Sequence, residues 1–143
     1  MSAWSQRLAI IARLLLSGVF IWAGAQKVRN PQLFALDLEA YRLLPAPMIL
    51  PIAYYLPWLE IATGLALWVP ALRRAALGLA ITLLFVFTAM LGIAWGRGLS
   101  IQCGCFGAGG GAATDFAVAI ARNVALLTAA TWMGIRATTR THA

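Results

Sequence analysis

The chain has 143 residues, of which 62% are hydrophobic and only 10% are charged. A soluble domain averages about one quarter charged residues, so this composition excludes a water-soluble globule and indicates an integral membrane protein. The net charge of +7 comes from eleven Lys and Arg against four acidic residues. The basic residues lie mostly between or at the ends of apolar runs, which is typical of anchoring at lipid headgroups. We therefore expect the lipid bilayer as a partner and no nucleic acid.

Four apolar segments are long enough to cross the hydrocarbon core of a bilayer, which takes about 20 residues of helix. They span about residues 8–25, 48–69, 75–95 and 116–135. We expect helices, because backbone groups in lipid must find hydrogen-bond partners within their own segment. Four strands would be too few to close a barrel. The sequence therefore predicts an all-α integral membrane protein, a four-transmembrane-helix bundle that forms one domain over residues 1–143.

Local signals refine these segments. Pro51 and Pro57 predict a late start or a kink in the second helix, and Thr114-Asp115 predicts an N-terminal cap for the fourth. Residues 26–47 mix apolar and charged side chains, which favours a short amphipathic helix at the membrane interface over an ordinary loop. The alternative for the first segment is a cleaved signal peptide ending near Ala23-Gly24-Ala25. The length of its apolar run and the arginine inside it favour a retained helix.

The basic residues favour an orientation with both termini in the cytoplasm. The cytoplasmic side then holds Arg7, Arg73, Arg74, Arg136 and Arg140. The outer side holds Lys27, Arg29, Arg42 and Arg97. Disulfides persist outside the cytosol, and this orientation also places the only two cysteines outside.

Cys103 and Cys105 lie in a glycine-rich stretch between the third and fourth segments. Two extended residues span roughly 7 Å, whereas a disulfide needs Cα atoms about 5.5 Å apart. A bridge therefore requires a bend at Gly104, which glycine permits, with Gly107 completing the geometry of the loop. So small a ring would be strained and add little stability, which is typical of a labile or catalytic disulfide. Cys103 and Cys105 are our candidate catalytic residues for thiol–disulfide exchange.

Other roles for the two cysteines stay open. They could be inert apolar residues or a structural bridge. They could also form half of a Cys₄ zinc site shared by a dimer. His142, the only histidine, lies in the C-terminal tail, so one chain cannot complete such a site. We expect no metal and no certain cofactor, although a membrane quinone near Tyr55 and Trp58 is an alternative.

Charged residues inside membrane helices usually face the bundle interior with a partner. Measured along the helices, Glu60 and Arg122 lie at similar depths below the outer face. We therefore prefer a Glu60–Arg122 ion pair, with Lys27 as the competing cation. Further hydrogen-bond partners would be Thr63 and Asn123. Glu60, Lys27 and Arg122 would form either a structural ion pair or a polar site beneath the cysteines, where a cation favours the reactive thiolate. Arg13, nearer the inner side, would snorkel or bond to backbone.

Several motifs together resemble a known family. They are Ala23-Gly24-Ala25-Gln26-Lys27, Tyr41-Arg42-Leu43-Leu44-Pro45, Leu56-Pro57-Trp58-Leu59-Glu60-Ile61-Ala62-Thr63-Gly64 and Gly98-Leu99-Ser100-Ile101-Gln102-Cys103-Gly104-Cys105-Phe106-Gly107. In this order, over nearly the whole chain, they resemble the methylamine-utilisation MauE family within the DoxX-like group of four-helix membrane proteins.

The resemblance implies a redox-associated, multi-pass protein of the bacterial inner membrane, with the cysteine loop in the periplasm. It also implies a link to maturation of the methylamine dehydrogenase small subunit, which carries tryptophan tryptophylquinone and many disulfides. The partners would be a thioredoxin-like periplasmic protein and a disulfide-containing substrate. Our leading hypothesis is a thiol–disulfide oxidoreductase. The alternatives are a non-catalytic assembly factor that docks a thioredoxin-like partner, and a quinone-linked thiol oxidoreductase.

Overall fold

The computed structural model describes residues 3–99 and 115–139, with side chains as far as Arg136. Within these ranges α-helix is the only regular secondary structure, which confirms the all-α prediction. The helices are α1 (Ala3–Arg29), α2 (Pro31–Ala40), α3 (Ala46–Ala66), α4 (Arg73–Gly96) and α5 (Phe116–Thr139). Among the described helices, α1, α3, α4 and α5 are long and apolar enough to cross a membrane. The ten-residue α2 is the short helix predicted between the first two spans.

The helix ends follow from local chemistry. α1 ends at Arg29, because Asn30 precedes a proline and the position before proline disfavours helical backbone. α3 begins at Ala46 with Pro47 in its first turn, where the missing N–H costs nothing. The predicted late start of this helix is therefore wrong, since both Pro51 and Pro57 lie inside it.

The cap predicted for the last helix is confirmed. The Asp115 carboxylate Oδ1 accepts hydrogen bonds from the backbone N–H groups of Ala117, at 3.1 Å, and Val118, at 3.3 Å. These N–H groups belong to the first turn of α5 and have no acceptor within the helix. Asp115 thereby fixes where α5 begins.

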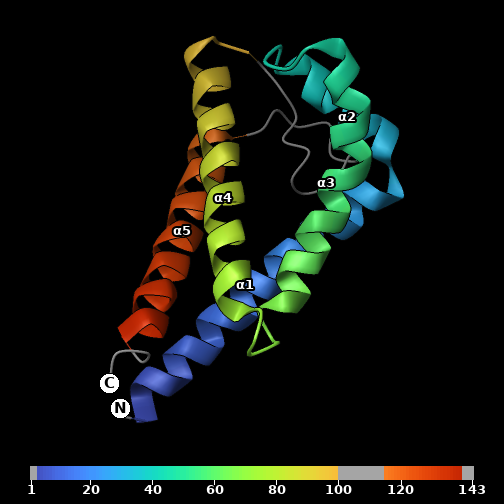
Figure 1. Cartoon of the computed structure of the whole chain (residues 1–143). Coiled ribbons are helices and arrows are strands. Elements are labelled where there is room, and N and C mark those ends of the chain that lie inside the picture. The colour runs from blue at the N-terminus through green and yellow to red at the C-terminus, as the bar shows by residue number, and fades with distance from the viewer. Residues whose placement is uncertain (1–2, 100–114, 140–143) are drawn as a thin grey trace.

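The long helices form two antiparallel pairs, α1 with α3 and α4 with α5 (Figure 1). The start of α1, the α3–α4 connection and the end of α5 lie at one end of the molecule (Figure 1). At the opposite end α2 covers the first half of α3, where Phe34, Ala35 and Leu38 pack on Ala53. We call these the terminal end and the α2 end.

Small residues bring α1 and α3 close together. A methyl group added at Gly24 would lie only 2.6 Å from the carbonyl oxygen of Pro57. One added at Gly64 would lie 2.7 Å from Ile21. The hydroxyl of Ser17 donates to the carbonyl oxygen of Gly64 at 2.8 Å, which ties the same crossing together. Close approach at small residues is the usual packing of helices in lipid, where no hydrophobic effect drives helices together.

The largest apolar core lies between the two helix pairs towards the terminal end. Its buried members include Leu16, Phe20, Leu67, Leu77, Leu84, Ala130 and Met133. A smaller cluster at the α2 end joins Tyr41 to Ala94, with Leu99 and Phe116 packed against them. These contacts position the two helix pairs around the polar site described next.

Candidate functional site

The interior holds a buried ion pair between Lys27, in the last turns of α1, and Glu60 in α3. The Lys27 Nζ lies 2.6 Å from Oε1 and 2.8 Å from Oε2 of Glu60. The side chains are 1% and 2% exposed. Side chains on a helix tilt towards its N-terminus, and the two helices are antiparallel. Lys27 and Glu60 therefore lean towards one another, and the close approach at Gly24 and Pro57 lets them meet.

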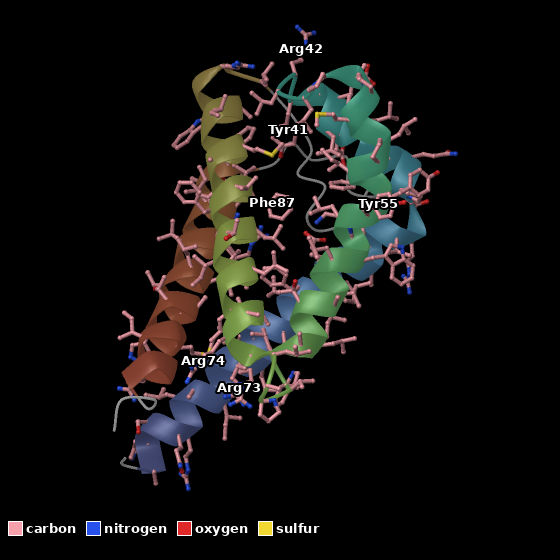
Figure 2. The ribbon with its side chains drawn as sticks, viewed as in Figure 1. Tyr41, Arg42, Tyr55, Arg73, Arg74 and Phe87 are labelled. Carbon is pink, nitrogen blue, oxygen red and sulfur yellow. The ribbon has the colours of Figure 1, made fainter. Side chains whose placement is uncertain are left out.

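Two aromatic rings enclose the ammonium group. The Nζ atom lies 5.1 Å from the ring centroid of Phe34 on α2 and 5.0 Å from that of Phe87 on α4. Figure 2 shows Phe87 between α4 and α3 in the interior of the molecule. Such rings stabilise a cation through their negatively polarised faces, more strongly where water is excluded. Lys27 thus joins α1, α2, α3 and α4 at one point.

The preferred ion pair between Glu60 and Arg122 is wrong. Glu60 pairs instead with Lys27, which the sequence analysis named as the competing cation. Arg122 on α5 instead donates from Nη2 to Oδ1 of its neighbour Asn123 at 3.1 Å. Asn123 is buried and Arg122 is half-buried. The reason lies in the packing, because among the described residues α5 packs against α4 and α1 rather than α3. Similar depth in the membrane therefore does not bring Arg122 to Glu60.

Thr63 does not bond to Glu60, and Arg13 contacts an aromatic ring. The Thr63 hydroxyl donates to the carbonyl oxygen of Leu59 at 2.7 Å, one turn back in α3, rather than to Glu60. The Arg13 guanidinium lies over the indole ring of Trp68, 5.7 Å from its centroid. A cation–π contact therefore holds the Arg13 guanidinium against Trp68.

A small pocket adjoins the aromatic rings around Lys27, between α2 and α4. It is lined by Phe34, Asp37, Leu38, Tyr41, Phe87, Met90 and Leu91. Its volume of about 20 Å³ suffices for roughly one water molecule. Partial burial raises the pKa of Asp37 above its ordinary value, because a charged carboxylate loses hydration there.

The sequence analysis did not identify most of the residues that surround Lys27 and the adjoining pocket. Phe34 and Asp37 lie three residues apart in a segment predicted to be an amphipathic helix, so their shared face could have been inferred. Phe87 lies in an uninterrupted apolar run and carries no signal in the sequence. Tyr41 belongs to a motif quoted for the resemblance, without a role. The aromatic contacts depend on where α2 and α4 pack, which composition does not encode.

The candidate catalytic residues Cys103 and Cys105, with Gly104 and Gly107, lie outside the described residues. The flanks of their segment are described. Leu99 and Phe116 both pack against Tyr41 and Ala94 at the α2 end. The chain thus leaves α4 and enters α5 at the end of the molecule where α2 lies (Figure 1).

These features define a class: an integral membrane protein of apolar helices that enclose a buried ion pair. Comparison with known families then places the chain within that class. The family model described as methylamine utilisation protein MauE matches residues 5–136. The chain therefore belongs to the MauE family, which confirms the resemblance seen in the motifs.

Curated relatives named methylamine utilization protein MauE match part of the chain. The relative from Methylophilus methylotrophus is 37% identical over 98 residues, covering 68% of this chain and 52% of the relative. That from Paracoccus denitrificans is 36% identical over 95 residues, covering 66% and 51%. That from Methylorubrum extorquens is 36% identical over 86 residues, covering 59% and 46%. The chain thus spans about half the length of these relatives. No solved structure matches it.

Proposed function

We propose that this protein exchanges disulfides outside the cytoplasm during maturation of a periplasmic protein, with Cys103 and Cys105 as the exchanging pair. The family supports a place in methylamine utilisation, and within it we propose maturation of the methylamine dehydrogenase small subunit. A thioredoxin-like periplasmic protein would be the redox partner. The cytoplasmic (inner) membrane would hold the protein with both termini inside and the cysteines in the periplasm.

One structural observation carries the proposal. Leu99 and Phe116 anchor both flanks of the cysteine segment at the α2 end, above the buried Lys27–Glu60 pair. Both flanks of the cysteine segment thus lie at the end of the molecule that α2 covers (Figure 1). This supports an exchange site that serves partners in the compartment this end faces.

The exchange itself needs no other group. In the dithiol form, the thiolate of one cysteine attacks a disulfide sulfur of the partner, which forms a mixed disulfide and releases one partner thiolate. The second cysteine then attacks the mixed disulfide, closes the Cys103–Cys105 bond and releases the other partner thiolate. Two electrons pass to the partner, whose thiolates take up the two protons. Exchange in the opposite direction oxidises the partner by the same steps.

The polar residues have separate parts in this proposal. The Lys27 ammonium already bonds both oxygens of Glu60, so we assign this pair to holding the helices beneath the cysteines. Arg122 lies six residues into α5, about 9 Å along the helix from Phe116. We assign it the cationic influence that favours a thiolate.

The test combines cysteine variants with trapping of thiols. Cys103→Ser and Cys105→Ser should each abolish maturation of the partner's disulfides, whereas Ala108→Ser, which adds a hydroxyl to the same segment, should not. A membrane-impermeant maleimide should label the native cysteines in intact cells after mild reduction. Normal maturation in the double Cys→Ser variant would refute the exchange role. Labelling only after lysis would refute the orientation.

A non-catalytic assembly factor is the second candidate. One observation favours it: α3 exposes a group of large aromatic side chains, Tyr54 at 51%, Tyr55 at 77% and Trp58 at 61%. Figure 2 shows Tyr55 on the outer side of α3. Aromatic residues are frequent where proteins bind one another as well as at lipid interfaces. Co-purification of the partner with the double Cys→Ser variant, lost in Tyr55→Ala with Trp58→Ala, would support this role.

A further inference from the structure

The half of the molecule towards the terminal end is strongly basic. Among the described residues its charged side chains are Arg7, Arg13, Arg73, Arg74 and Arg136. All four acidic residues of the chain lie elsewhere: Asp37 and Glu39 on α2, Glu60 within α3, and Asp115 before α5. Even Glu60 is eight residues from Trp68, about 12 Å along the helix. Within the described residues, no side-chain carboxylate therefore lies beside Arg13 or Arg73.

Two of these arginines are held close to each other. Arg13 and Arg73 contact the consecutive residues Trp68 and Leu67. Arg13 lies over the Trp68 ring, and the Trp68 indole N–H donates to the Ser17 hydroxyl at 3.0 Å, which fixes the ring. The Arg73 Nε donates to the carbonyl oxygen of Leu67 at 3.3 Å. Two half-buried positive charges are thus fixed near one another, although like charges repel.

The start of α4 adds to this positive potential. Arg73 and Arg74 occupy the first turn of α4, which contains no acidic residue. Figure 2 shows both arginines where α4 begins at the terminal end. The N-terminus of a helix carries a partial positive charge, so cations are unfavourable there and an anion is favourable. An anion beside Arg13 and Arg73 would therefore be favourable at this end of α4.

The neighbouring surface indicates where such an anion comes from. Leu14 and Leu15 on α1, Leu65 near the end of α3 and Leu72 on the α3–α4 connection are more than half exposed. Trp68, 43% exposed, is of the residue type that gathers at the level of lipid headgroups. A phospholipid would satisfy both features, with its phosphate at the arginines and its acyl chains on the leucines. A free phosphate would leave the apolar surface unused.

We propose that Arg13, Arg73 and the ring of Trp68 form a binding site for the phosphate of an anionic phospholipid, at the terminal end of the molecule. Arg73 uses one of its five N–H donors on Leu67. The remaining donors of the two guanidinium groups suit the oxygens of a phosphate, which arginine binds through paired hydrogen bonds. The site does not depend on the thiol chemistry proposed above.

The test measures lipid binding by the full chain. The protein is placed in nanodiscs of phosphatidylcholine with increasing mole fractions of phosphatidylglycerol, and its melting temperature and bound lipid, by native mass spectrometry, are recorded. We expect phosphatidylglycerol to raise the melting temperature. Arg13→Gln and Arg73→Gln should each weaken its binding about tenfold, the effect of losing one charge-assisted hydrogen bond. Arg13→Lys, which keeps the charge and is less disruptive, should retain part of the binding.

Two controls make the result decisive. Arg7→Gln removes the same charge from the same basic half, six residues away on α1, where the side chain is exposed. Equal weakening by Arg7→Gln and Arg13→Gln would mean diffuse surface charge and would overturn the site. Inorganic phosphate alone is the second control. If it raised the melting temperature as much as the lipid does, the site would bind free anions and the assignment to lipid would be wrong. If Arg13→Gln failed to fold, Arg73→Gln and Arg13→Lys would still decide between these outcomes.

Discussion

At the scale of single residues, the ion pair between Lys27 and Glu60 has the largest energetic consequence. Each charge is tolerated in the interior only because the other is bonded to it. Removing one partner leaves an uncompensated buried charge, which costs about 3–5 kcal/mol. We expect Lys27→Met and Glu60→Gln each to destabilise the protein by this amount, as measured by unfolding in denaturing detergent.

The double variant Lys27→Met with Glu60→Gln tests the cause. It removes both charges, so it should be markedly more stable than the sum of the single changes implies. Glu39→Gln, at an exposed carboxylate on α2, should change the free energy of unfolding by less than about 0.5 kcal/mol. Strictly additive effects of the two substitutions would show that the charges do not depend on each other.

Asp37 should give the protein a pH-dependent stability. Burial raises the pKa of its carboxyl above the unfolded value, so the folded state disfavours the ionised form. The associated penalty is absent below the unfolded pKa, about 3.9. This penalty grows as the pH rises through the window between the unfolded and folded pKa values, and it remains in full above that window.

We expect Asp37→Asn to raise the melting temperature at pH values above this window and to leave the melting temperature nearly unchanged at the acidic end. Melting curves against pH for wild type, Asp37→Asn and Glu39→Gln would check this. A similar gain in Glu39→Gln would assign the effect to general surface charge.

At the scale of helices, the α1–α3 crossing depends on the missing side chain of Gly24. A methyl group there would lie against the Pro57 carbonyl and Ile61, and backbone cannot give way cheaply. We expect Gly24→Ala to lower the free energy of unfolding by about 1–3 kcal/mol, as overpacking does.

Gly78 on α4 is the matched control, since a methyl group there meets nothing within 4 Å. Gly78→Ala should be neutral or stabilise the protein by up to about 1 kcal/mol, the helix-propensity difference. Equal losses in both variants, measured by detergent unfolding, would exclude a specific crossing.

Much of the fold could be predicted because it depends on short, local stretches of sequence. The four spans follow from hydropathy, and the Asp115 cap follows from a single residue before an apolar run. The late start considered for α3 was wrong, because Pro51 and Pro57 both lie inside the helix, where proline is less common. Helix existence was therefore easier to predict than helix boundaries.

The partners of the polar site could not be predicted in the same way. Depth along a helix ranks Arg122 and Lys27 almost equally as partners of Glu60. The choice is made by lateral packing, which brings α1 against α3 through Gly24 and leaves α5 against α4. Such packing depends on contacts between segments distant in the chain. A glycine facing a proline carbonyl is recognisable only once the helices are in place.

At the scale of the whole molecule, the arrangement of ends sets which positions share a compartment. The start of α1 and the α3–α4 connection lie at the terminal end, and α2 lies at the other (Figure 1). In a background without the native cysteines, we expect Ala71→Cys and Glu39→Cys, both exposed, to react with impermeant maleimide from opposite sides of the membrane. In the proposed orientation only Glu39→Cys is labelled in intact cells. Labelling of both from one side would contradict the arrangement of spans.

The pairing of Lys27 with Glu60 also bears on how the chain enters the bilayer during synthesis. An unpaired charge at the centre of an inserting helix costs about 2.5–3.5 kcal/mol. Because α1 leaves the ribosome before α3, the cation is already in place when the carboxylate arrives. The third helix can then leave the translocon against the first, with its charge neutralised on arrival. The order of helices along the chain thus lets α1 supply the counter-charge for Glu60 of α3.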